Sequence, residues 1–170
     1  MSNLTDYGIV GYMAPKWDVA KWIDEDGKPA KINMHHYDWK MKVIFCFQSG
    51  CKGSHKVGFP ALKKMVDALK GDDRIAFFAV QTVFEGQEEN TFEKIRKIQK
   101  QYKLKIPFGH DPGDESTDNI SKIMHNYRSK GTPWFIVIGT GGSVVYNDFQ
   151  INVKKAIVVL KELAEEEEED

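Results

Sequence analysis

The sequence predicts an α/β fold, in which helices flank a mixed central sheet and an N-terminal β-hairpin extends it. Two apolar runs rich in β-branched and aromatic residues, 41–47 and 75–82, indicate buried strands, and a helical periodicity follows each. Near the C-terminus, the runs 134–139 and 143–146 flank Thr140-Gly-Gly142, which is typical of an antiparallel hairpin. Parallel strands joined by helices and closed by a hairpin give a mixed sheet covered on both faces.

The two helices that follow the strands show different boundary signals. Apolar residues recur at helical spacing from Cys51 to about residue 69, and Gly71 ends that helix. Pro60 lies inside it and predicts a kink or break. The second helix is expected over about 88–102, with its apolar residues on one face.

The remaining elements are shorter or lie near the ends of the chain. Residues 106–108 indicate a short extended piece, and Ser116 is a candidate N-cap for a helix that ends near Tyr127. An amphipathic helix is expected over 153–163. Residues 17–23 alternate in polarity before a turn at 24–27, which predicts the N-terminal hairpin.

Length and composition indicate one globular domain. At 170 residues, the chain is expected to form a single domain over 1–164. Residues 165–170 are an uninterrupted acidic run that cannot bury apolar surface, so we expect a disordered tail or a solvated, frayed helix end. No internal repeat or interdomain linker is apparent.

The charge balance excludes some partner classes. The chain has 24 basic and 25 acidic side chains, and this balance favours neither nucleic acid nor an anionic membrane as a partner. The N-terminal residues lack the pattern of a secretory signal, and no stretch is apolar enough to span a bilayer. We therefore expect a cytoplasmic protein that contacts neither nucleic acid nor membrane.

Cys46 and Cys51 are the two cysteines of the chain. Two are too few for a disulfide scaffold. Cys46 lies inside a predicted strand and Cys51 follows the end of that strand, so a disulfide between them is not expected. We expect Cys46 to pack in the core as a small apolar residue.

Cys51 carries the strongest functional signal because it lies between a strand and a helix. Free N–H groups and the positive end of the helix dipole favour thiolate over thiol, and a lowered pKa supplies a nucleophile near neutral pH. Lys52 adds positive charge nearby. His55, four residues on, lies on the same helical face as a cationic neighbour or proton partner, although a solvated surface histidine is the alternative.

These motifs resemble the thioredoxin-like redoxins, in particular the TlpA-type thiol-disulfide oxidoreductases and the related AhpC-TSA-like proteins. Ala14-Pro-Lys-Trp17 resembles the entry segment of that family, and Asp26-Gly-Lys28 its first hairpin turn. Cys51-Lys-Gly-Ser-His55 resembles its Cys-x-x-Cys helix start. Gly131-Thr-Pro-Trp-Phe135 resembles its cis-proline loop. The resemblance implies a thioredoxin-like fold and a role in redox homeostasis or antioxidant defence.

The cis-proline loop has its own implication. In the family fold, the X–Pro bond is cis and lies opposite the active cysteine, and cis bonds are uncommon even before proline. The resemblance therefore implies that Thr132 and Pro133 bind substrate, with Thr132 offering backbone hydrogen bonds to an extended chain beside the sulfur.

Ser54 departs from the family pattern because it occupies the position of the second cysteine. A dithiol enzyme attacks with the first sulfur and resolves the mixed disulfide with the second, which serine cannot do. Three interpretations remain open: a natural monothiol protein that uses an external thiol such as glutathione, an engineered Cys→Ser variant, or a domain that now only binds. Ser54 can also hydrogen-bond the Cys51 thiolate.

The sequence therefore predicts thiol–disulfide exchange with a protein or low-molecular-weight disulfide or thiol, without a cofactor. The catalytic candidates are Cys51 and Ser54, supported by Lys52 and His55. A non-catalytic binding module is the alternative from another class. Peroxidase activity is disfavoured, because the peroxiredoxin Pro-x-x-x-Thr/Ser-x-x-Cys pattern would need a proline and a hydroxyl in place of Ile44 and Gln48. A metal site is not expected because Cys51 and His55 lack a third ligand.

Overall fold

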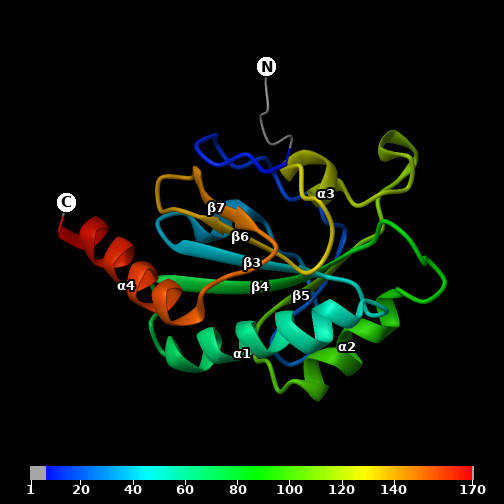
Figure 1. The fold of residues 1–170 in the computed structure, drawn as a ribbon, viewed down its shortest axis with the longest axis horizontal. Coiled ribbons are helices and arrows are strands. Elements are labelled where there is room, and N and C mark those ends of the chain that lie inside the picture. Colours follow the sequence, from blue (N-terminus) through cyan, green and yellow to red (C-terminus); the bar gives the residue numbers. More distant parts are fainter. Residues whose placement is uncertain (1–6, 170) are drawn as a thin grey trace.

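The computed structural model describes residues 7–169, and seven strands among them form one mixed sheet (Figure 1). The strand order across the sheet is β2-β1-β5-β4-β3-β6-β7. The strands are β1 (Lys21–Ile23), β2 (Pro29–Ala30), β3 (Met41–Phe47), β4 (Ile75–Thr82), β5 (Phe108–Asp111), β6 (Trp134–Ile138) and β7 (Val144–Asp148). Strands β3, β4 and β5 are parallel, and antiparallel pairs flank them on both sides. The predicted mixed sheet is therefore present.

Strand β3 lies in the interior of the sheet, where the sequence places its most apolar run. It pairs with β4 in parallel and with β6 antiparallel, and all seven of its residues are buried. A strand covered on both faces has no solvated face, which explains a continuous apolar run instead of alternation. The carboxyl end of β3 at Phe47 thus delivers the following loop to the middle of one sheet edge.

Within residues 7–169, four α-helices cover the sheet: α1 (Phe59–Ala68), α2 (Phe92–Gln101), α3 (Lys122–Tyr127) and α4 (Val153–Glu169). Buried residues of α1, α2 and α4 share one apolar cluster with the sheet, whereas α3 packs on the other face with Trp17 and Trp22. Figure 1 shows α3 on the side of the sheet opposite α1 and α2. None of the described helices is both long and apolar enough to cross a membrane.

The helix that follows Cys51 is irregular in its first turns, as Pro60 predicts. Residues 52–53 are helical, Ser54–Gly58 form a π-helical turn, and α1 continues from Phe59. Pro60 has no N–H for a regular helical hydrogen bond to the turn before it, and a wider turn at this point accommodates that loss. The regular helix therefore starts one residue before the proline.

The second predicted helix starts later than expected. It was predicted from about residue 88, but α2 begins at Phe92. The N–H groups of Glu89 and Asn90 both donate to the Gly86 carbonyl, which closes a tight turn before the helix. Hydrogen bonding within this turn overrides the helical preference of the glutamates that it contains.

The prediction of Ser116 as a helix N-cap is wrong. Ser116 lies in a short 3₁₀ turn, Glu115–Thr117, that Asp114 caps. The cap of α3 is Ser121, whose hydroxyl accepts a hydrogen bond from the Met124 N–H. The loop contains two residues that cap helical turns, Asp114 and Ser121. The periodicity of the sequence does not indicate which of such residues starts the helix.

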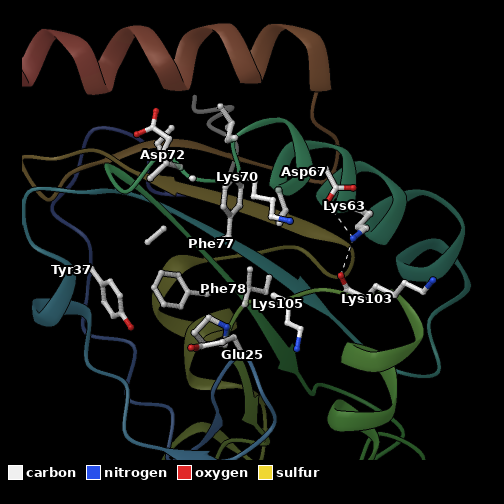
Figure 2. Close-up of a pocket in the computed structure, with 17 residues that line it drawn as sticks. Glu25, Tyr37, Lys63, Asp67, Lys70, Asp72, Phe77, Phe78, Lys103 and Lys105 are labelled. Atoms are coloured by element: carbon white, nitrogen blue, oxygen red, sulfur yellow. Dashed lines mark hydrogen bonds and ion pairs between the residues drawn. The ribbon is translucent and has the colours of Figure 1, made fainter.

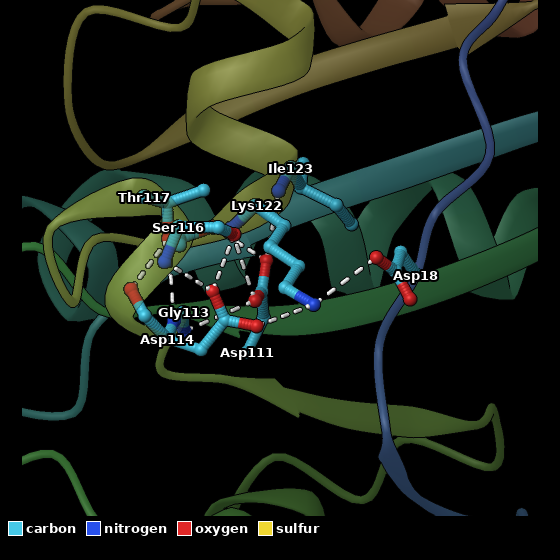
Figure 3. Close-up of polar contacts among 9 residues, drawn as sticks. Asp18, Asp111, Gly113, Asp114, Ser116, Thr117, Lys122 and Ile123 are labelled. Atoms are coloured by element: carbon cyan, nitrogen blue, oxygen red, sulfur yellow. Dashed lines mark hydrogen bonds and ion pairs between the residues drawn. The ribbon is translucent and has the colours of Figure 1, made fainter.

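Buried Asp111, at the end of β5, fixes the start of α3 (Figure 3). Its carboxylate accepts hydrogen bonds from the Ser121 hydroxyl at 2.6 Å and from the N–H groups of Lys122 and Ile123 at 3.1 and 2.9 Å. Lys122 extends outward and pairs with both Asp18 and Asp114. Negative charge at the first turn also matches the helix dipole. One carboxylate therefore joins the sheet to the helix on this face.

The hairpins and the last helix agree with prediction, apart from one boundary. Strands β1 and β2 form the N-terminal hairpin, and β6 and β7 form the C-terminal one. Helix α4 continues to Glu169, beyond the predicted end at residue 163, so the acidic residues 165–169 have a helical backbone. The division into a domain over 1–164 and a tail over 165–170 stays a prediction.

Candidate active site

Cys51 lies between β3 and the first helical residue, in the context that the sequence predicts. Its N–H donates to the Gln48 carbonyl at 3.0 Å, which closes the turn after β3. Its carbonyl accepts from the His55 N–H at 3.4 Å, so Cys51 begins the helical hydrogen-bond pattern. The side chain is only partly buried. A partly exposed cysteine at a helix start is open to a substrate disulfide.

Two short contacts define the surroundings of the sulfur. The backbone N–H of Ser54 donates to Cys51 Sγ at 3.4 Å, and the thiol donates to the Thr132 carbonyl at 3.5 Å. Burial alone would raise the pKa of Cys51, but its interactions with Ser54, Thr132 and the Gly53 backbone together hold that pKa below its ordinary value. The site therefore favours the nucleophilic thiolate.

The Thr132–Pro133 loop packs directly against the Cys51 helix. The Thr132–Pro133 bond is cis, as the resemblance implies. Two glycines permit the close approach: a Cβ on Gly53 would lie 3.2 Å from Pro133 Cδ, and one on Gly58 would lie 2.9 Å from Pro133 Cβ. The structure thus brings Cys51, Thr132 and Pro133 together from positions about 80 residues apart, a separation that the Cys51–Thr132 hydrogen bond spans.

Ser54 is fully buried next to Cys51. Its hydroxyl accepts a 3.4 Å hydrogen bond from the Gln48 N–H, while its own N–H donates to the sulfur. Ser54 therefore links the end of β3 to the cysteine.

His55 takes a different place from the one predicted. Its Nε2 lies 2.7 Å from the Ser49 carbonyl and its Nδ1 lies 2.6 Å from the Tyr102 hydroxyl. Because a carbonyl only accepts, Nε2 donates to Ser49, while Nδ1 is hydrogen-bonded to the Tyr102 hydroxyl. Both ring nitrogens thus have partners, and neither partner is the sulfur. His55 holds the loop before Cys51 against α2. Lys52, the other predicted supporting residue, is exposed beside Cys51.

Three buried amide side chains at this site escaped the sequence analysis: Gln48, Gln81 and Asn90. The Gln81 side-chain oxygen accepts from the Ser49 N–H at 3.0 Å, and the Asn90 oxygen accepts from the Gly50 N–H at 2.9 Å. Their positions in the sequence could have identified two of them, because Gln48 follows one apolar strand and Gln81 lies near the end of the next. Polar residues at such strand ends indicate hydrogen bonds to the adjoining loops.

Cys46 lies in the core, as predicted. It is fully buried in β3, and both cysteines are free thiols. Burial raises the pKa of Cys46, with a smaller contribution from the Asp111 carboxylate. Cys46 therefore stays a protonated thiol while Cys51 is the accessible one. Among residues 7–169, no group of His, Cys, Asp and Glu side chains could hold a metal ion.

A cavity of about 400 Å³ adjoins Cys51 and is bordered by Gly50, Thr132 and the β4–α2 loop. A second cavity of about 410 Å³ lies near the start of β4, away from the sulfur (Figure 2). Charges of both signs line this second cavity, among them Lys63, which pairs with Asp67 at 3.2 Å. Of these two cavities, the first is the one lined by a cysteine, so we place the candidate active site there.

No protein-family model and no curated protein matches the sequence. Solved structures do match the fold. A crystal structure described as a thioredoxin-like superfamily protein superimposes with a TM-score of 0.78 at 25% identity, covering 91% of this chain and 97% of that one. A thiol-disulfide isomerase from Corynebacterium glutamicum gives 0.75 at 21% identity over 94% and 98% of the two chains. The thioredoxin domain of a thiol-disulfide oxidoreductase from Bacteroides vulgatus gives 0.65 at 20% identity over 91% and 98%. The chain therefore has a thioredoxin-like α/β fold similar to that of thiol-disulfide oxidoreductases.

Proposed function

We propose that the protein carries out thiol–disulfide exchange with Cys51 as the nucleophile. The observation that carries the proposal is the environment of Cys51 Sγ. Cys51 is partly exposed at a helix start, the pKa of its thiol is lowered by its surroundings, and its sulfur lies 3.5 Å from the Thr132 carbonyl oxygen, next to Pro133. These are the requirements for a thiolate that attacks a disulfide presented along the Thr132 backbone.

The exchange has two balanced steps. Cys51 first loses its proton to solvent, and the thiolate attacks one sulfur of a substrate disulfide. A bond forms between Cys51 and that sulfur as the substrate S–S bond breaks, and the electron pair leaves with the second substrate sulfur as a thiolate. The thiolate of an external thiol, of a small molecule or a protein, then attacks the substrate sulfur of the mixed disulfide. A new disulfide forms between these two sulfurs as the bond to Cys51 breaks, and Cys51 leaves as a thiolate. The external thiol is required because Ser54 has no sulfur for the second step.

Other residues act on the site through position. Thr132 and Pro133 would align the substrate backbone, as an exposed carbonyl and N–H do for an extended peptide. His55 and the three buried amides hold the loop that carries the sulfur. Lys52 adds positive charge at the solvent side of the helix start.

The test uses a neutral small disulfide, hydroxyethyl disulfide, with a neutral external thiol, N-acetylcysteamine. We expect the protein to accelerate exchange between them, and mass spectrometry to detect the mercaptoethanol adduct on Cys51. Cys51→Ala should abolish both signals, whereas the matched variant Cys46→Ala should keep them because Cys46 is fully buried. Equal rates for wild type and Cys51→Ala would contradict the proposal.

One feature favours a second candidate, a binding module without turnover. Ser54 is buried and hydrogen-bonded in the position where a resolving cysteine would act. A protein that forms the Cys51 adduct neither with hydroxyethyl disulfide nor with an alkylating reagent near neutral pH would support this second function.

A further inference from the structure

The charged side chains that line the cavity beside Cys51 are both negative. Its lining includes Cys51, Thr132, Gly50, Glu85 and Glu89. The two glutamates are its only charged lining residues apart from the cysteine thiolate itself, since the rest of the lining is uncharged. Neither glutamate forms an ion pair with a basic side chain among the residues that the structure describes. Lys52, the basic residue next to Cys51, is exposed and is not one of the residues that line the cavity.

Glu89 extends its carboxylate over the backbone next to the cysteine. A Cβ built on Gly50 would lie 2.6 Å from both Cδ and Oε2 of Glu89. Because Gly50 immediately precedes Cys51, the Glu89 carboxylate lies against the residue next to the nucleophile. The absence of a side chain at Gly50 is what leaves room for the carboxylate.

The loop that carries the glutamates is held to the cysteine loop by buried side chains. The Gln48 side-chain oxygen accepts from the N–H groups of Phe84 and Glu85, at 2.9 and 3.3 Å. The Asn90 side chain accepts from the Gly50 N–H at 2.9 Å and donates to the carbonyls of Glu85 and Gly86, both at 3.0 Å. Gln48 and Asn90 are each 3% exposed. The glutamate backbones are therefore fixed relative to Cys51.

We propose that Glu85 and Glu89 make Cys51 selective for disulfides that carry a positive charge beside the reactive sulfur, such as a peptide cystine flanked by lysine or arginine. This inference rests on the proposed function and names the substrate class of the same site. A cleft lined by one sign of charge raises the local concentration of oppositely charged reactants and repels those of like charge. The same field disfavours an anionic resolving thiol, and added salt screens it.

The first test needs no disulfide substrate. Cys51 is reacted with two methanethiosulfonates of similar size, one carrying a trimethylammonium and the other a sulfonate group. In each reaction the Cys51 thiolate forms a disulfide with the reagent sulfur, and methanesulfinate leaves. The measured quantity is the ratio of the cation rate to the anion rate at low ionic strength. Changes in thiolate fraction affect both rates equally and cancel in this ratio.

We expect the double variant Glu85→Gln/Glu89→Gln to lower this ratio by about tenfold, the lower end of electrostatic steering effects on rates. Glu88→Gln is the matched control, because Glu88 is exposed on the same loop but does not line the cavity. It should leave the ratio within about twofold of wild type, and salt should reduce the wild-type ratio. An unchanged ratio in the double variant would overturn the inference.

The second test separates the inference from the proposed function. Cystamine, a dicationic disulfide, and hydroxyethyl disulfide, a neutral one, are compared as exchange substrates. Faster exchange with cystamine that is lost in the double variant supports both proposals. Exchange with both disulfides at a ratio that the double variant does not change overturns only the charge selectivity. Failure of both disulfides to react, with the methanethiosulfonate ratio still dependent on the glutamates, overturns the exchange function but keeps the charged cavity.

Discussion

The backbone N–H of Ser54 donates to Cys51 Sγ across 3.4 Å, while the Ser54 side chain is fully buried at the same helix start. Under the proposed function, Ser54 stands where a resolving cysteine would act. A sulfur in place of its oxygen would lie near Cys51 Sγ, on the protein side and away from solvent. Substitution at this one position is therefore the most direct way to change the chemistry of the site.

We predict that Ser54→Cys converts the protein from a monothiol into a dithiol. With dithiobis(nitrobenzoate), the wild-type protein should release about one thionitrobenzoate and keep the other as a mixed disulfide on Cys51. Ser54→Cys should release about two, because the second thiol displaces the adduct and forms an internal disulfide. The release is read from thionitrobenzoate absorbance, and the disulfide from the mass of the product.

Ser54→Ala is the control for that substitution, since it removes the hydroxyl without adding a sulfur. It should keep the wild-type stoichiometry. Ser54→Cys that stops at a stable mixed disulfide would show that the two sulfurs cannot reach each other at this helix start.

The pH dependence of Cys51 alkylation tests the lowered pKa. Burial opposes ionisation, but the interactions with Ser54, Thr132 and Gly53 outweigh it and hold the pKa of Cys51 below its ordinary value. The rate with iodoacetamide should therefore reach half its maximum below pH about 8.5, the ordinary cysteine value. Ser54→Ala should shift this midpoint upward, because one donor to the thiolate is lost. Peptide mapping assigns the alkylated residue.

The lowered pKa of Cys51 also makes the free energy of unfolding depend on pH. Because the folded state holds the Cys51 pKa below its unfolded value, the contribution of Cys51 to the free energy of unfolding is present above the unfolded pKa. That contribution is lost as the pH falls through the folded pKa. If the alkylation rate of Cys51 reaches half its maximum at or above pH about 8.5, the ordinary cysteine value, the proposed activation of the thiol is contradicted. A binding module without turnover would then be the better function.

The sequence reveals the Cys51 loop, but it does not reveal what holds the loop. The cysteine, the following helix and the Thr132–Pro133 loop each carry a local pattern. The amides of Gln81 and Asn90 bind Ser49 and Gly50 across 32 and 40 residues, and such pairings depend on how the strand ends meet in space. Sequence position indicates that a polar residue lies at a strand end, and only the fold determines its partner.

His55 and Ser116 show the same limit for two other kinds of prediction. Helical spacing places His55 on the face of Cys51, yet Tyr102, 47 residues away, and the Ser49 carbonyl take its ring nitrogens. Ser116 has the right residue type for a cap, but the buried carboxylate of Asp111 selects Ser121 as the start of α3. In both cases a tertiary hydrogen bond decides between local alternatives of similar energy.

Asp111→Asn should destabilise the fold without disabling Cys51. The buried carboxylate accepts hydrogen bonds from Ser121, Lys122, Ile123 and, at 3.4 Å, from Gly113. An amide at this position turns an NH₂ group toward at least one of these donors and leaves it unsatisfied. We expect the free energy of unfolding to fall by about 1–3 kcal/mol, measured by chemical denaturation.

Asp114→Asn is the matched control on the same loop, since Asp114 has an exposed side chain and pairs with Lys122 at the surface. Its cost should be well below that of Asp111→Asn, because the ion pair with Lys122 is exposed to solvent and an asparagine oxygen can still cap the 3₁₀ turn. The alkylation rate of Cys51 should match wild type in both variants. Equal destabilisation by the two substitutions would mean that the Asp111 hydrogen bonds do not anchor α3.

The last prediction concerns the close packing of the Cys51 helix on the cis-proline loop. A Cβ on Gly58 would lie 2.6 Å from Phe45 Cζ and 2.9 Å from Pro133 Cβ. Both neighbours belong to rings packed against the sheet and the helix, so neither can turn aside as a flexible side chain would. Gly58→Ala must therefore move the helix or the Pro133 loop, and we expect a loss of about 1–3 kcal/mol in the free energy of unfolding.

Because the Pro133 loop also places the Thr132 carbonyl beside Cys51, the same substitution should slow exchange with hydroxyethyl disulfide in protein that is still folded. Gly141→Ala is the control, since a Cβ there meets nothing within 4 Å. It should change neither stability nor exchange rate appreciably. A Gly58→Ala variant that loses stability but exchanges at the wild-type rate would show that the spacing between helix and loop serves packing alone, and that the Thr132 carbonyl does not align the substrate.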